Sequence, residues 1–218
     1  NPAAARASGI EPRRIQAIAI LFGGLCGGLA GGTLVLAQVG TFAEGMSAGR
    51  DIGVVMNRPN HEGPCLLPAC GGVGTQYTPA TGWAQSLVYR ARVLGDASAS
   101  GCIAVAHGGD ASTATNGFWA SLNVATTGRL PLLYFIEDNG YGISVPSSRQ
   151  TPGGDIAANL ASFQNLRILS GDGADPEAAA ALIEAAVTTV RAGDGPAFLH
   201  LMVPRLSGFT TQTTQLMP

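Results

Sequence analysis

Apolar and polar positions alternate in blocks from about residue 101 to residue 203. Apolar runs at 101–106, 130–137, 165–173 and 195–205 are bounded by Gly, Pro, Asp and Asn, as short buried strands are. Segments with apolar residues at helical spacing lie between them. The alternation of strand and helix predicts an α/β fold, a doubly wound parallel sheet with right-handed crossovers.

Start and stop signals predict helices at 78–94, near 116–128 and at 175–191. Thr78 and Pro79 begin the first helix, and Asp155 is expected to cap a further short one. Gly128 is a natural stop for the second helix, whose predicted buried face contains Phe118, Leu122 and Ala125. The buried face predicted for the third contains Leu182, Ile183, Ala186, Val187 and Val190.

The first part of the chain has a different character. Residues 15–43 form a run of 29 uncharged residues, preceded by Arg13 and Arg14. Such a run is long enough to cross a bilayer, so membrane association through 15–43 is expected if it inserts. The alternative is a glycine-rich buried helix or loop of a soluble protein.

Composition narrows the function classes. Charged residues make up 12% of the chain, the net charge is -2, and all basic residues are Arg. No basic field for nucleic acid is therefore expected, and a Schiff-base lysine is excluded. The four cysteines form no CxxC pair, so we expect them to be reduced and mostly buried rather than a zinc site with His61.

Polar residues follow two of the predicted strands. Asp110 follows the apolar run at 101–106, and Asn139 follows the run at 130–137. Because the carboxyl ends of neighbouring parallel strands collect ligands, these oxygens should lie together. Carboxylate, amide and carbonyl oxygens are the hard donors that Mg²⁺ prefers when it also holds a diphosphate.

The spacing of Gly109-Asp110-Ala111 from Asp138-Asn139-Gly140-Tyr141, just under thirty residues, resembles the thiamine diphosphate motif. The stretches GFWASLN and EDNGYGISVP resemble the alpha subunit of the decarboxylating first component of 2-oxo acid dehydrogenases. The resemblance covers about 50–218 and implies a thiamine diphosphate-binding fold, truncated at both ends. An ordinary doubly wound domain with a helix cap at Asp110 is the alternative.

The resemblance implies roles for individual residues. Metal ligands would be the Asp110 carboxylate, the Asn139 side chain and the Tyr141 carbonyl. The other implied cofactor contacts are Val73, beneath the thiamine or else simply core, Arg205, in the active-site loop, and three residues around the diphosphate, Gly109, Ala111 and Ser112. No catalytic residue is assigned; His61 is a candidate near the active-site entrance, with a surface-loop histidine as the alternative.

The implied activity is oxidative decarboxylation of a 2-oxo acid with thiamine diphosphate and Mg²⁺, and acyl transfer to a lipoyl-bearing acyltransferase. The activating glutamate comes from the beta subunit in this family, so the chain alone should be inactive. This chain has Phe209 where relatives have a histidine, and Thr213 and Thr214 where they have acidic residues. The missing histidine puts turnover in doubt. Pyruvate, branched-chain and 2-oxoglutarate substrates stay open.

Residues 1–49 resemble an internal piece of the permease of sugar or nucleoside ABC importers, in LCGGLAGGTLVLAQVGTF and EGMSAGR. We therefore expect a permease-like segment at 1–49 and a cofactor domain at 50–218, in a cytoplasmic protein. The alternative function is a fragment of a membrane ABC transporter permease fused to a catalytically inactive α/β domain.

Overall fold

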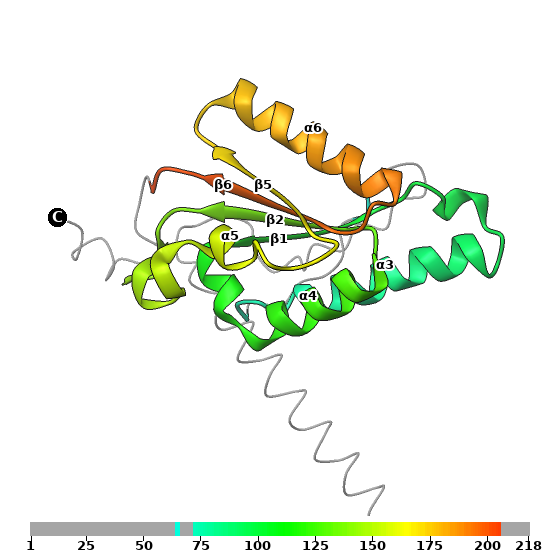
Figure 1. The fold of residues 1–218 in the computed structure, drawn as a ribbon, viewed down its shortest axis with the longest axis horizontal. Helices are drawn as coiled ribbons and strands as arrows, with labels where there is room; N and C mark the ends of the chain where they lie inside the picture. The colour runs from blue at the N-terminus through cyan, green and yellow to red at the C-terminus, as the bar shows by residue number, and fades with distance from the viewer. Residues whose placement is uncertain (1–63, 66–71, 206–218) are drawn as a thin grey trace, which may run out of the picture. The chain divides into compact units, whose positions relative to one another are not determined.

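The computed structural model describes residues 64–65 and 72–205, and 72–205 lie within one unit, Gly72–Pro218. A parallel sheet forms its centre, in the order β1-β2-β6-β5. The strands run over Ala104–Gly109 (β1), Leu132–Asp138 (β2), Arg167–Asp172 (β5) and Ala197–Met202 (β6). Figure 1 shows them side by side between two helical layers. The predicted α/β class with a parallel sheet is confirmed for this unit.

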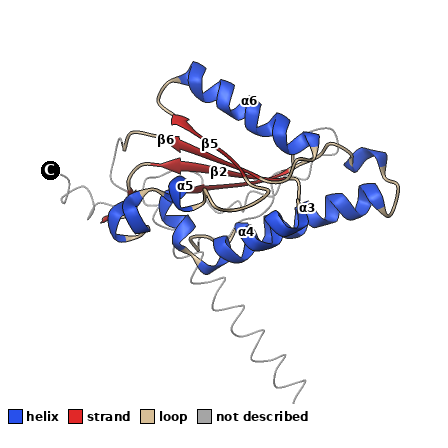
Figure 2. Ribbon diagram, viewed as in Figure 1, coloured by secondary structure: helices blue, strands red, loops and turns tan. Residues whose placement is uncertain are grey.

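Helices cover both faces of the sheet, as Figure 2 shows. One face carries α3 (Tyr77–Arg92), α4 (Asn116–Gly128) and the short α5 (Ile156–Asn159). The other face carries α6 (Pro176–Ala192). Parallel sheets are covered on both faces because their crossover helices pack there, so the sheet is doubly wound as predicted.

The core between the sheet and the layer of α3, α4 and α5 is aromatic. The rings of Tyr77, Phe118, Tyr134 and Phe198 are fully buried and contact one another edge-on or tilted. The predicted apolar face of α4 is confirmed, because Phe118, Leu122 and Ala125 are all buried. Tyr77 of this core also contacts Ser112, in the turn that follows β1.

The opposite core is aliphatic and includes the predicted face of α6. Ala186 and Val190 are buried against the sheet, and the other predicted members pack at the edge of the cluster, namely Leu182, Ile183 and Val187. Asp175 caps the helix by accepting hydrogen bonds from the backbone N–H groups of Glu177 and Ala178. The sequence signal for this helix is therefore confirmed at its start and along its face.

Several element ends differ in detail from the predictions. β1 starts at Ala104 rather than residue 101, because Gly101 adopts a turn conformation with φ +73°; the strand instead continues through His107 to Gly109, paired with β2. Helix α4 ends as expected, but the left-handed residue at its end is Arg129, with φ 46°, not Gly128.

Short elements connect these layers. A two-stranded antiparallel pair, β3 (Tyr141–Gly142) and β4 (Val145–Pro146), follows β2. The 3₁₀ turns are η1 (Ala97–Ala99), η2 (Asp110–Ala114), η3 (Ser147–Arg149) and η4 (Pro152–Gly154). Asp155 caps α5 as predicted, accepting from the N–H of Ala158.

Within the described part of the chain no helix is long and apolar enough to cross a membrane. Residues 15–43, where a membrane span was predicted, lie outside the described residues.

Candidate functional site

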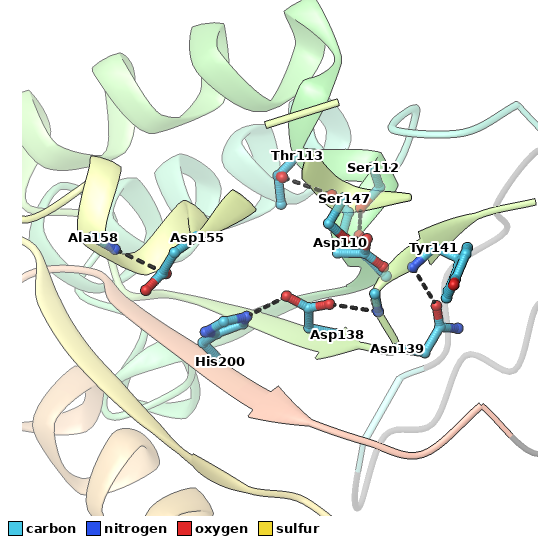
Figure 3. Close-up of polar contacts among 12 residues, drawn as sticks. Asp110, Ser112, Thr113, Asp138, Asn139, Tyr141, Ser147, Asp155, Ala158 and His200 are labelled. Carbon is cyan, nitrogen blue, oxygen red and sulfur yellow. Dashed lines mark hydrogen bonds and ion pairs between the residues drawn. The ribbon is translucent and has the colours of Figure 1, made fainter. Parts of the chain in front are cut away.

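The candidate site lies where β1 and β2 end. The parallel register pairs Gly109 with Glu137, so Asp110 and Asp138 leave the sheet at neighbouring positions. Figure 3 shows Asp110 together with Asp138, Asn139 and Tyr141 at this edge. The prediction that the two strand ends meet is confirmed, whereas the binding roles assigned to individual residues stay predictions.

Asp110 opens the 3₁₀ turn η2 and is 4% exposed. Its carboxylate Oδ2 accepts a hydrogen bond from the Ser147 hydroxyl at 2.6 Å. Its backbone carbonyl accepts another from the Thr113 hydroxyl at 2.7 Å. Burial of a carboxylate is costly without a partner, and among the described residues Ser147 supplies that partner.

Ser112 connects this turn to the core. Its hydroxyl lies 2.5 Å from the Tyr77 hydroxyl and donates to the Gly109 carbonyl at 2.5 Å. Burial raises the pKa of Tyr77 to about 12, because the phenolate would be desolvated, with the Ser112 hydrogen bond as a smaller opposing effect. Tyr77 from α3 therefore supports the turn as a neutral phenol.

The second strand end forms a tight, exposed turn. The Asn139 side-chain oxygen accepts from the N–H of Tyr141 at 3.0 Å, and the Asp138 Oδ1 accepts from the N–H of Gly140 at 2.8 Å. Gly140 has φ +78°, where residues with a Cβ are strained. The chain thereby turns back at once, with the Asn139 oxygen oriented toward its own loop.

Sequence reasoning missed a buried pair beside this turn. Asp138 Oδ2 lies 2.8 Å from Nε2 of His200, which β6 contributes and which is 5% exposed. The hydrogen bond from His200 lowers the pKa of Asp138, against the opposing effect of burial. The available signal was a histidine within the apolar strand FLHLM, since a buried imidazole requires a polar partner.

The backbones of the two turns approach each other closely. A Cβ on Gly142 would lie 2.6 Å from the Cβ of Ala111, so glycine is required there. A Cβ on Gly140 would meet nothing within 4 Å.

A carboxylate, an amide oxygen and a peptide carbonyl from Asp110, Asn139 and Tyr141 form the hard-oxygen donor set of Mg²⁺, so the residues present fit this ion.

Val73 and Arg205 are two further predicted cofactor contacts among the described residues. Val73 is 63% exposed, so the alternative that it belongs to the core is wrong. The guanidinium carbon of Arg205 lies 4.8 Å from the ring centroid of Tyr141, which places the predicted basic residue against the second turn. His61 and Phe209 lie outside the described residues.

The cysteine prediction needs correction. Cys65 and Cys102 are both exposed, not buried, and the Cys102 thiol donates to the Ser98 carbonyl. Over residues 64–65 and 72–205 no cluster of three or more His, Cys, Asp or Glu side chains could hold a metal. The predicted magnesium set contains a single such side chain, Asp110, so this finding leaves it open.

A doubly wound parallel sheet with side-chain oxygens at the ends of two adjacent strands has the architecture in which α/β domains commonly bind ligands. The family model described as "Dehydrogenase E1 component" matches residues 33–214. The chain therefore belongs to the dehydrogenase E1 component family. The match begins inside the segment compared above with a permease, and that second resemblance stays a prediction.

Relatives agree with this membership. The alpha subunit of 3-methyl-2-oxobutanoate dehydrogenase from Mycobacterium tuberculosis (strain CDC 1551 / Oshkosh) is 32% identical over 149 residues, covering 67% of this chain and 38% of the relative. The pyruvate dehydrogenase E1 component subunit alpha of Rhizobium meliloti (strain 1021) is 30% identical over 138 residues, covering 63% and 37%. The chain thus spans less than two fifths of these curated relatives.

A solved structure from Mycobacterium smegmatis, described as thiamin diphosphate-dependent, is 27% identical to the chain. The matched region covers 62% of this chain and 23% of the solved chain, with a TM-score of 0.44. That score is too low for its fold or ligand to be carried over to this chain.

Proposed function

We propose that this chain is the cofactor-binding part of the alpha subunit of a 2-oxo acid dehydrogenase, holding thiamine diphosphate through Mg²⁺. The observation that supports this is the meeting of Asp110 with the Asn139–Tyr141 turn at adjacent strand ends, in a member of the E1 family. The relatives act on 3-methyl-2-oxobutanoate and on pyruvate according to their names, so a small 2-oxo acid is the proposed substrate.

The proposal assigns Mg²⁺ to the Asp110 carboxylate, the Asn139 side-chain oxygen and the Tyr141 carbonyl. Around the diphosphate it places Gly109 with the backbone amides of Ala111 and Ser112. Val73 is exposed and would offer an apolar surface to the thiamine rings. Arg205, held against Tyr141, would add positive charge near the diphosphate.

Thiamine diphosphate, when bound, supplies the carbon nucleophile and the electron sink for decarboxylation. The residues of this chain bind and orient it, and the beta subunit of the same enzyme contributes the activating carboxylate. A lipoyl-bearing acyltransferase would accept the acyl group. We assign this role to residues 50–218; the permease-like role of 1–49, its membrane association and a cytoplasmic location stay predictions.

Isothermal titration of thiamine diphosphate into the full chain tests the proposal, with Mg²⁺ present or replaced by EDTA. We expect binding only with Mg²⁺ for the wild type. Asp110→Asn keeps the shape and an acceptor for Ser147 but removes the charge, so metal-dependent binding should fall at least a hundredfold, given the strength of carboxylate ligation.

Asp172→Asn is the matched control, because Asp172 also ends a strand of the same sheet but lies on β5 and accepts only from the N–H of Ala174 among the described residues. This variant should bind like the wild type. Equal affinity in Asp110→Asn and wild type would refute the metal assignment. Absence of binding in the wild type, with or without Mg²⁺, would favour a catalytically inactive domain.

A further inference from the structure

Ser147 contacts both turns of the candidate site. Its hydroxyl donates to Oδ2 of Asp110 at 2.6 Å, and its backbone N–H donates to the carbonyl of Gly140 at 2.9 Å. Figure 3 shows the Ser147 side chain next to Asp110. Ser147 therefore links the residue after β1 to the turn after β2 by two hydrogen bonds.

The position of Ser147 is itself fixed. It opens η3, and its carbonyl accepts from the N–H groups of Gln150 at 3.0 Å and Thr151 at 2.8 Å. The side chain of Gln150 then donates to the carbonyl of Val145 at 2.7 Å. The hydroxyl is thus presented from a closed turn that follows the β3-β4 pair.

Asp110 depends on this hydroxyl for its orientation. In the described part of the chain, Ser147 is the one group that donates a hydrogen bond to the Asp110 carboxylate. A hydrogen bond to a charged group is among the stronger ones in proteins. Without it the carboxylate could rotate, and its ordering would be left to the metal.

We propose that Ser147 is a positioning residue, which fixes the Asp110 carboxylate and its separation from the Asn139–Tyr141 turn before Mg²⁺ and the diphosphate bind. This inference rests on the function proposed above. Such support of a ligand by an outer hydrogen bond raises metal affinity, commonly by ten- to a hundredfold. No contact between Ser147 and the metal or the cofactor is required.

The test compares Ser147→Ala, Ser147→Thr and Ser148→Ala in the full chain. Thr restores a hydroxyl, and Ser148 is an exposed neighbour whose side chain makes no hydrogen bond within the described residues. Titrating thiamine diphosphate at several Mg²⁺ concentrations should give about tenfold weaker binding for Ser147→Ala, and a higher Mg²⁺ concentration for half-saturation. Ser147→Thr should restore affinity to within about twofold of the wild type, and Ser148→Ala should bind like it.

Hydrogen exchange of the Gly140 and Tyr141 amides, without cofactor or metal, gives a second measurement that does not require binding. Ser147→Ala should speed their exchange, because Asp110 no longer holds the end of the loop. Unchanged affinity, Mg²⁺ requirement and exchange in Ser147→Ala would overturn the proposal, as would a Ser147→Thr variant as weak as Ser147→Ala. A wild type that binds nothing would instead overturn the proposed function, and the positioning role with it.

Discussion

The two turns of the candidate site differ in how their geometry is maintained. The buried half, η2 at Asp110–Ala114, has Asp110, Ser112 and Thr113 at 4%, 4% and 0% exposure. The exposed half, residues 139–145, has Tyr141 at 41% and Ile143 at 53%. One half belongs to the core, whereas the other lies at the surface.

The contacts that hold each half in place differ accordingly. The buried half is held by Tyr77, from a helix 35 residues earlier in the chain, and by packing beneath it. The exposed half is held by hydrogen bonds within the loop, two between residues two apart, at Asp138–Gly140 and Asn139–Tyr141, and one from the Ser147 N–H to the Gly140 carbonyl. Core substitutions should therefore act on stability and on the buried half together, whereas substitutions in the exposed half should change the free energy of unfolding by about 1 kcal/mol or less.

The largest effect is expected from Phe118→Ala. Phe118 is fully buried and its ring contacts those of Tyr77, Tyr134 and Phe198. Removing such a side chain leaves a cavity, so the free energy of unfolding should fall by about 3–5 kcal/mol. Urea unfolding followed by far-UV circular dichroism measures it.

Val124→Ala is the control for this variant, since Val124 lies on the same helix α4 but is 43% exposed. Its effect should stay within about 0.5 kcal/mol. If Phe118→Ala cost no more than Val124→Ala, the aromatic core would not be what holds the buried half.

Hydrophobic spacing predicted the fold because the periodic segments are long and their environments uniform. The faces of α4 and α6 came from apolar residues three and four apart, and the cap of α6 came from Asp175 before Pro176. The start of β1 was misplaced because an apolar run does not show where pairing begins; Gly101 turns away with φ +73°, and the strand continues into His107 and two glycines.

The site was predictable only where it follows from strand ends. Asp110 and Asn139 each follow an apolar run, so topology alone brings them together. Ser147 reaches Asp110 across 37 residues and His200 reaches Asp138 across 62. Such pairings depend on the register of strands and the path of loops, which no local pattern encodes.

At high pH, stability should be lost through Tyr77, the buried residue of α3 that supports η2. Because burial raises the pKa of Tyr77 to about 12, its contribution is complete below pH 10, the ordinary value, and is lost as the pH rises from 10 through 12. At 1.36 kcal/mol per pH unit the loss amounts to about 2–3 kcal/mol. Urea unfolding at pH 9 and at pH 12 measures it.

Tyr77→Phe should lose less stability over this interval than the wild type, because the phenol that must ionise is gone while the ring still packs. Tyr134, whose pKa burial also holds above the usual range, would account for the remaining slope. A steeper slope in Tyr77→Phe than in the wild type would contradict the sign.

The smallest effect is expected in the exposed half, from Ile143→Asn. Ile143 has φ +57°, a left-handed conformation that costs a β-branched residue about 1–2 kcal/mol and that Asn adopts readily. Because the Ile143 side chain is half exposed, little burial is lost, and the free energy of unfolding should rise by up to about 1 kcal/mol. Val145→Asn, at a similarly exposed position without a positive φ, should give no such gain. A destabilised Ile143→Asn variant would mean that this turn is held by apolar contacts of Ile143 rather than by its own hydrogen bonds, and the contrast between the two halves would not hold.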